Sequence, residues 1–252
     1  MEAFSYQDYV SDAAFIDRYN SYQTKYSKQM RESDRIIIEL VREIQSKHDF
    51  NSGPMRLLDI GCSTGNLLLH LKSCLPQLTL TGADLAESSL QACRANQELE
   101  GVEFKIMDLL NLPAGADYNI VSVNAVLYMM DDAQFANGLR SIAGSLKPGG
   151  TLIAFDFFHP YSQDLHINEI STSHPDGLRL RFRPMDMVRP ILSEAGFKNA
   201  VFRPFTLPFD LPVSGEAADL ITYTVPTLEG KKLPFRGTLF QPWCHLVAVR
   251  EG

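Results

Sequence analysis

A short glycine-containing segment, residues 59–65 with the sequence Asp-Ile-Gly-Cys-Ser-Thr-Gly, holds residues whose types and spacing suit ligand chemistry. It follows an apolar run and precedes a helical pattern, so it is expected to turn from a strand into a helix. Glycine lets a ligand touch the backbone, and open α/β sheets bind ligands at such turns. From Gly61 to Gly65 the spacing is Gly-x-x-x-Gly, not the Gly-x-Gly-x-x-Gly of dinucleotide sites. The segment therefore predicts a ligand without phosphates and argues against a nicotinamide dehydrogenase.

The longer pattern Leu-Asp-Ile-Gly-Cys-Ser-Thr-Gly, residues 58–65, resembles the first motif of class I S-adenosylmethionine-dependent methyltransferases. The resemblance continues in order through about residues 55–157. It implies an enzyme with S-adenosyl-L-methionine as its cofactor and no metal. It also implies that the methionine part of the cofactor lies against the backbone of Gly61, Cys62 and Gly65, with its ammonium group near the carboxylate of Asp59.

The resemblance extends to residues at the ends of the later predicted strands. Asp84 ends the second predicted strand, where an acid can accept both ribose hydroxyls; the alternative is that it caps the next helix. The resemblance places Asp108 on the adenine amino group, with Leu85 and Leu109 against the ring. It places Asn124, at the end of the fourth strand, beside the cofactor. Because the acids end successive strands, we expect them at one edge of the sheet.

Candidates for the methyl-acceptor side follow the fourth and fifth strands. Tyr128 is expected to form part of the pocket wall, and no Pro-Pro or Pro-Cys motif of nucleobase methylation occurs near it. Transfer from a sulfonium is an in-line displacement, which requires alignment and exclusion of water. A hydroxyl acceptor would also gain from a general base, for which His159 is the first candidate, ahead of His166 and His174. A structural role for these histidines remains the alternative.

Three arginines, Arg179, Arg181 and Arg183, alternate with apolar residues, so on a strand their guanidinium groups would share one face. They would suit an anionic acceptor. The alternative is the solvated outer face of a hairpin, because every half-buried strand alternates in this way.

Tyrosines crowd the N-terminal segment. Tyr9, Tyr19, Tyr22 and Tyr26 are candidates for a lid, because aromatic faces attract cations and shield them from water. We expect Tyr19 and Tyr22 to be closest to the reacting groups. The alternative is that these rings only pack a helical cap onto the core.

The elements that position these residues follow from periodicity. Short apolar runs alternate with amphipathic ones, which indicates strands joined by crossover helices. Strands are predicted at 55–60, 78–83, 102–107, 118–124 and 151–157. Helices are predicted from about 64–66 to before Pro76, at 87–99 and at 132–146, the last ended by a turn at 147–150. The resemblance implies a Rossmann-like fold, with a mostly parallel seven-stranded sheet and helices on both faces.

A single domain is expected, with a helical cap at 1–50, a cofactor-binding core at 55–157 and substrate-side additions at 158–252. In the additions we predict a hairpin at 170–183, a helix at 184–195 ended by Gly196, hairpin arms at 219–225 and 234–240, and a final strand at 243–250. Frequent prolines from 204 to 242 predict edge strands and loops, rather than central sheet, for the last fifty residues.

Composition limits the function classes. The chain has 252 residues and a net charge of −7, which argues against a broad nucleic-acid surface and favours a small-molecule acceptor. Four cysteines show no zinc spacing, and neither a signal peptide nor a long apolar run is evident, so a cytoplasmic location is expected. The oligomeric state stays open. The alternatives are an RNA or protein methyltransferase and a non-catalytic cofactor-binding protein.

Overall fold

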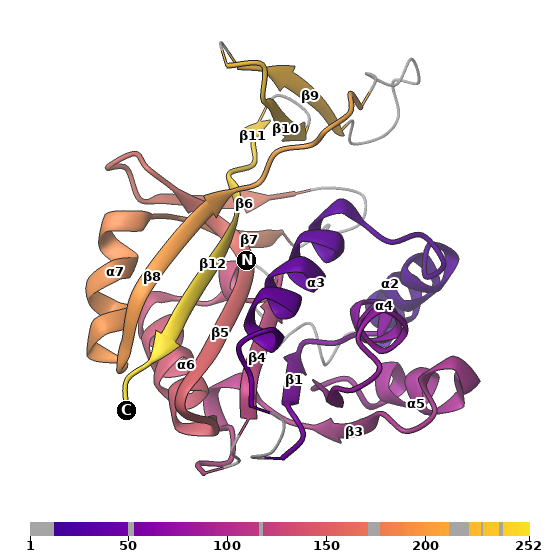
Figure 1. The fold of residues 1–252 in the computed structure, drawn as a ribbon. Helices are drawn as coiled ribbons and strands as arrows, with labels where there is room; N and C mark the ends of the chain where they lie inside the picture. The colour runs from indigo at the N-terminus through magenta and orange to yellow at the C-terminus, as the bar shows by residue number, and fades with distance from the viewer. Residues whose placement is uncertain are drawn as a thin grey trace.

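The computed structural model describes residues 13–49, 53–115, 118–170, 177–211, 222–227, 229–236 and 239–252. Its centre is a sheet in which seven strands follow the order β3-β2-β1-β4-β5-β12-β8 (Figure 1). The strands are β1 (Arg56–Ile60), β2 (Thr79–Asp84), β3 (Glu103–Ile106), β4 (Tyr118–Asn124), β5 (Leu146–His159), β8 (Phe197–Pro204) and β12 (Trp243–Arg250). The first five are parallel, and β12 is antiparallel to both neighbours. The predicted Rossmann-like architecture is confirmed.

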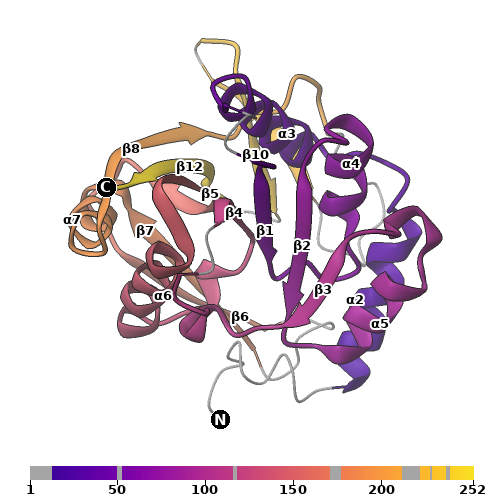
Figure 2. The same ribbon diagram turned by 60° about the horizontal axis from the view of Figure 1, so that its bottom comes forward.

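Helices cover both faces of this sheet, as Figure 2 shows. On one face, α3 (Glu32–Gln45), α4 (Asn66–Cys74) and α5 (Glu87–Ala95) enclose a core that includes Leu57 and Ile153. On the other, α6 (Asp132–Ser145) and α7 (Met185–Glu194) pack over the adjacent strand residues Leu58 and Ala154. Neighbouring strand residues thus point into different cores, which explains why the parallel strands are apolar throughout.

In the parallel core, most predicted boundaries agree with the structure to within a few residues, with two exceptions. Strand β5 begins at Leu146, so the predicted turn at 147–150 lies inside it; Gly149, at φ 75°, and a shifted register opposite Tyr118 bend the strand there. Helix α5 ends at Ala95 rather than near 99. The side chain of Asn96 accepts the N–H of Glu98 and starts a separate turn, η2 (Gln97–Leu99).

The prediction that the last fifty residues lack central sheet is wrong for β12. This strand lies between β5 and β8, and Cys244, Leu246 and Ala248 are fully buried. The prolines all precede residue 243, so the final segment can donate hydrogen bonds to both neighbours. The chain end therefore completes the core.

Two smaller β units follow the parallel core. Strands β6 (Leu165–Glu169) and β7 (Leu178–Pro184) form the predicted hairpin, although its first arm lies before residue 170; residues 171–176 are outside the described residues. Strand β7 also pairs with the end of β5. Strands β9 (Thr222–Pro226), β10 (Lys232–Arg236) and β11 (Leu239–Phe240) form a second sheet, which projects beyond the main sheet in Figure 1. The predicted arm at 234–240 is thus divided between two strands.

The N-terminal segment contributes α2 (Ala13–Lys25) and α3, as the predicted helical cap requires. The Oγ of Ser89 in α5 donates to the Oδ1 of Asn20 at 3.0 Å, and the Nδ2 of Asn66 in α4 donates to the carbonyl of Gln23 at 3.0 Å. These bonds place α2 beside the first two helices of the core. Among the described residues, no helix combines the length and apolar character needed to cross a membrane.

Candidate functional site

The turn after β1 depends on glycine at two positions. Gly61 and Gly65 have φ values of 71° and 78°, in the left-handed region. A Cβ on Gly61 would lie 2.5 Å from the Cγ2 of Val126, and one on Gly65 would lie 2.7 Å from a methyl group of Leu99. The N–H groups of Gly61 and Cys62 both donate to the carbonyl of Ala83, at 2.8 and 3.0 Å. Strand β2 therefore fixes the turn, and little other than glycine fits it.

Asp84 joins this turn to the one after β2. Its Oδ2 accepts the N–H of Ser63 at 2.8 Å, and its Oδ1 accepts the N–H of Ala86 at 2.9 Å. Ala86, not Asp84, occupies the N-cap of α5, so a helix-cap role does not account for this acid. A carboxylate has about four acceptor positions, so acceptor capacity remains for a ligand's hydroxyl groups. Burial raises the pKa of Asp84, and hydrogen bonds with the backbone of Ala86, Ser63 and Leu85 oppose that rise.

Asp59 lies on the adjacent strand and is only 3% exposed. Its Oδ1 accepts a hydrogen bond from the Oγ of Ser122 at 2.6 Å. Burial raises its pKa to about 7; the Ser122 bond lowers it, while the charges of Asp34 and Asp84 raise it further. The predicted gathering of Asp59 and Asp84 at one edge of the sheet is thus observed.

Asp34 is a third buried carboxylate, which sequence reasoning missed. It lies in the first turn of α3, is 2% exposed, and accepts a hydrogen bond from the Nδ2 of Asn124 at 3.4 Å. Burial raises its pKa, against the opposing effects of Arg31 and His70. A signal was present, because Asp34 has helical spacing with Ile37, Ile38 and Val41 and so falls on the apolar stripe of α3. An acid on such a stripe is buried.

These raised pKa values predict how the ligand-free protein responds to pH. A group whose pKa is higher in the folded than in the unfolded state binds extra protons when folded, so stability falls as pH rises between the two values. For Asp59 this range is about 4 to 7. We expect Asp59→Asn to reduce the loss of unfolding free energy between pH 5 and pH 8 by on the order of 2–4 kcal/mol.

Thermal and urea unfolding across this pH range, followed by circular dichroism, measures the effect. Glu87→Gln is the control, because this exposed residue lies in the first turn of α5. An Asp59→Asn protein that loses stability with pH as steeply as the unchanged chain would contradict the prediction.

The remaining predicted cofactor residues differ in placement. Asn124 ends β4 beside Asp34, and Asp108 follows β3 with its Oδ1 accepting the N–H of Leu110 at 2.9 Å. Leu85 is half-buried after β2. Leu109 packs in the core against Gly138 of α6, so the expectation that it contacts the adenine ring is not supported. The side chain of Cys62 is also buried. The part of this residue that lies at the surface of the turn is therefore its backbone and not its thiol.

The region predicted to receive the acceptor contains a wall of aromatic rings. Tyr128 lies in the short helix η4 (Leu127–Met129), and its ring centroid is 5.3 Å from that of Phe157 and 6.3 Å from that of Trp243. Trp243 also stacks on Phe155, with centroids 4.7 Å apart. Pairing of β12 with β5 sets Trp243 opposite Phe157. The sequence pointed to Tyr128 but not to the other three rings.

His159 lies at the junction of β5 and β7. It is 2% exposed, and its Nε2 lies 3.0 Å from the carbonyl of Phe182 in β7. A carbonyl only accepts, so Nε2 carries the proton and Nδ1 keeps the lone pair; among the described residues this buried Nδ1 has no hydrogen-bond partner. Only Nδ1 is therefore available to accept a proton, and the role of His159 as a base stays a prediction. His166, on the neighbouring β6, is exposed and lies 2.6 Å from Asp164, whereas His174 is outside the described residues.

The arginine stripe shares one face as predicted, but its members differ in environment. Arg179 is exposed and Arg181 is half-buried. Arg183 is buried, and its guanidinium donates to the carbonyls of Leu127 and Met130. Backbone carbonyls thus engage two of its five N–H donors, and its role as an anion ligand stays a prediction that its burial does not favour.

The tyrosines of α2 also differ in how far they are buried. Tyr19 is half-buried; burial raises its pKa, while Arg31 and a hydrogen bond with Gln23 lower it and the charge of Asp84 raises it. Tyr22 is 58% exposed and packs against Tyr26 at the surface, with ring centroids 5.0 Å apart. The lid prediction therefore rests on Tyr19. Tyr9 lies outside the described residues.

Fold and site together define an α/β protein of the Rossmann-like class, with buried carboxylates gathered at the carboxyl edge of a parallel sheet. Residues 57–150 match the family described as methyltransferase domain. The matched segment is less than half of the chain, and it includes the turn at residues 59–65 and the carboxylates Asp59 and Asp84.

Several named proteins are similar to this chain. A malonyl-[acyl-carrier protein] O-methyltransferase from Haemophilus ducreyi is 29% identical over 201 residues, which cover 78% of this chain and 74% of that protein. One of the same name from Bacillus cereus is 24% identical over 149 residues, covering 59% and 54%. The chain spans about half the length of several such relatives.

Solved structures share the fold. A complex between a Haloferax volcanii methyltransferase activator and the protein assigned as its methyltransferase contains a chain with a TM-score of 0.62 and 16% identity, covering 95% of this chain and 97% of that one. At this identity the likeness concerns the fold alone.

Proposed function

We propose that the protein binds S-adenosyl-L-methionine at the carboxyl edge of β1, β2 and β4 and transfers its methyl group to an oxygen or nitrogen atom of a small molecule. The observation that carries the proposal is the group of three buried carboxylates, Asp34, Asp59 and Asp84. Among the described residues, none of the three forms an ion pair. Buried charges require partners, and the ammonium and sulfonium groups of this cofactor are cations.

The residues fit the rest of the cofactor as well. The remaining acceptor capacity of Asp84 suits a pair of ribose hydroxyls, and Asp108 with half-buried Leu85 suits a purine base. The Oγ of Ser63 is buried without a hydrogen-bond partner among the described residues, beside the Gly61–Gly65 turn. A donor in that position suits the methionine part.

When bound, the cofactor supplies an electrophilic methyl group. The protein's task is then to align the acceptor behind that group and to exclude water, which a displacement of this kind requires. Tyr19 from α2 and Tyr128 from η4 are proposed for this positioning. His159, through its Nδ1, stays the candidate general base for a hydroxyl acceptor, whereas an amine or a carboxylate acceptor would need none.

Two features bear on the acceptor. The wall formed by Tyr128, Phe157 and Trp243 favours a molecule with an apolar or aromatic part. An anionic acceptor group would now depend on Arg179 and Arg181; the Nη1 of Arg181 is buried without a partner among the described residues. The similar proteins named malonyl-[acyl-carrier protein] O-methyltransferases support an oxygen acceptor. The net charge of −7 disfavours RNA.

Calorimetry and a methyl-transfer assay test the proposal in sequence. We expect titration with S-adenosylhomocysteine to give micromolar affinity. Transfer from labelled cofactor is then measured for uncharged aromatic compounds, free carboxylates, acyl-carrier-protein thioesters and bulk RNA. Absence of cofactor binding would overturn the proposal. Binding without transfer to any of these would favour the non-catalytic alternative, and transfer to RNA alone would favour the macromolecular one.

A further inference from the structure

The η4 turn, which we define as residues 127–130, connects the cofactor edge of β4 to helix α6. It begins two residues after Ala125, whose φ of 57° is unusual for a residue with a side chain. Tyr128 of the acceptor wall lies within it. The position of this ring therefore depends on how the turn is held.

A buried carboxylate from β5 holds the amino side of the turn. The Oδ2 of Asp156 accepts the N–H groups of Leu127 at 2.8 Å and Tyr128 at 3.2 Å, while its Oδ1 accepts the N–H of Phe157 at 2.8 Å. Asp156 is 1% exposed. Both oxygens are thus engaged by backbone, two of the three bonds by the turn itself.

A buried guanidinium from β7 holds the carbonyl side. The Nη1 of Arg183 donates to the carbonyl of Leu127 at 3.2 Å, and its Nη2 donates to that of Met130 at 2.6 Å and lies 3.5 Å from Asp132. The group also lies over the ring of Phe135 in α6, 4.3 Å from its centroid. Arg183 thereby ties the β6–β7 hairpin, outside the parallel core, to the turn.

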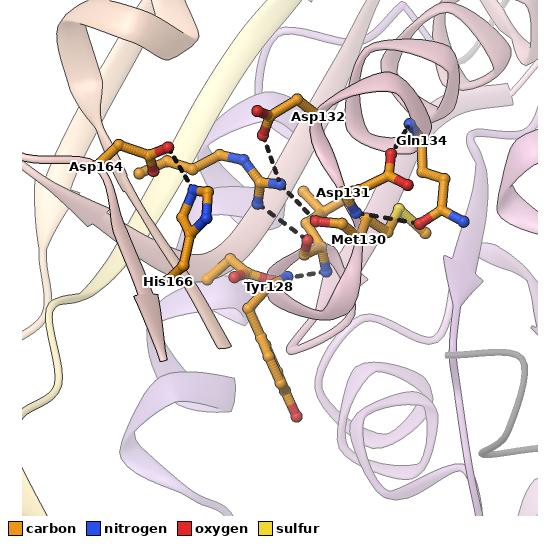
Figure 3. Close-up of polar contacts among 10 residues, drawn as sticks. Tyr128, Met130, Asp131, Asp132, Gln134, Asp164 and His166 are labelled. Atoms are coloured by element: carbon orange, nitrogen blue, oxygen red, sulfur yellow. Dashed lines mark hydrogen bonds and ion pairs between the residues drawn. The ribbon is translucent and has the colours of Figure 1, made fainter. Parts of the chain in front are cut away.

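Figure 3 shows the consequence: these polar contacts surround the turn, and the ring of Tyr128 extends away from them. The same ring contacts Phe157 and Trp243. Apolar residues of matching volume often stabilise a core as well as buried charged groups do. What Asp156 and Arg183 add is direction, because a planar guanidinium fork and a carboxylate bond the backbone at defined angles.

We propose that Asp156 and Arg183 are positioning residues that set the η4 turn and thereby orient Tyr128 in the wall of the acceptor pocket. The inference rests on the proposed function only in assigning that wall to an acceptor. The orientation itself can be measured without cofactor or acceptor.

Trp243 is the only tryptophan in the chain, so its fluorescence reports on this wall. We expect Arg183→Gln to increase acrylamide quenching of Trp243 about twofold, because Tyr128 loses its fixed position. In a Tyr128→Ala background, Arg183→Gln should add little to the quenching, since Arg183 is proposed to affect Trp243 through Tyr128. Arg179→Gln, on the same strand and face but exposed, is the control and should leave quenching unchanged.

Arg183→Lys keeps the buried charge without the fork, so it should give an intermediate increase; it serves as the test if Arg183→Gln does not fold by circular dichroism. An equal increase with and without Tyr128, or no increase from either variant, would overturn the proposal. With an acceptor in hand, we further expect Arg183→Lys to raise its KM about tenfold while the Kd of S-adenosylhomocysteine changes less than twofold. A large loss of cofactor affinity would instead indicate a general disturbance and count against it.

Discussion

Replacing Asp84 with alanine is expected to weaken the binding of S-adenosylhomocysteine at least about 100-fold, which corresponds to about 3 kcal/mol. Two effects combine in this substitution. The ligand loses the acceptor proposed for its ribose hydroxyls, and the N–H groups of Ser63 and Ala86 lose the carboxylate that aligns the turns after β1 and β2. A buried donor left without a partner costs about 1–3 kcal/mol by itself. Isothermal titration calorimetry measures the affinity directly.

Asp131→Ala separates loss of binding from loss of stability. Asp131 forms a reciprocal cap with Gln134 at the start of α6, away from the proposed cofactor residues. Its removal should lower the unfolding free energy by about 1 kcal/mol and leave the Kd of S-adenosylhomocysteine unchanged. If Asp84→Ala bound this ligand within threefold of the unchanged protein, the proposed ribose site would be wrong.

Gly61→Ala is the second substitution with a large expected effect. The left-handed φ of 71° costs a residue with a side chain about 1–3 kcal/mol. The added methyl group would also lie 2.5 Å from Val126, which must move. We expect the unfolding free energy to fall by about 2–4 kcal/mol. We also expect cofactor binding to be lost, because the altered backbone is the surface proposed to contact the methionine part.

Urea unfolding and calorimetry measure the two consequences separately. Gly144→Ala is the matched control, since Gly144 lies in α6 with nothing within 4 Å of an added Cβ. There alanine should stabilise the protein by about 0.5–1 kcal/mol through its higher helix propensity. A Gly61→Ala protein as stable as the unchanged chain, with normal affinity, would show that the turn tolerates a side chain.

The parallel core was predictable because its signals are local. Alternation of short apolar runs with amphipathic helices, and glycines at the turn after β1, are properties of neighbouring residues, and they agree with the observed order of strands and helices. Since the carboxyl ends of parallel strands share one edge, placing Asp59, Asp84 and Asn124 at the ends of β1, β2 and β4 also placed them together. The final strand was harder, because its position between β5 and β8 depends on pairing with segments about 40 to 100 residues away.

By itself, then, the sequence determined the class of fold, the turn at residues 59–65 and the acids at the strand ends. The tertiary structure decided which other side chains share their space. It brought Asp34 of the cap to Asn124, set Trp243 beside Phe157, and buried Arg183 where alternation predicted a solvent-facing or ligand-binding residue. The physical reason is that periodicity specifies the face on which a residue lies, whereas burial and hydrogen-bond partners depend on which distant element packs against that face.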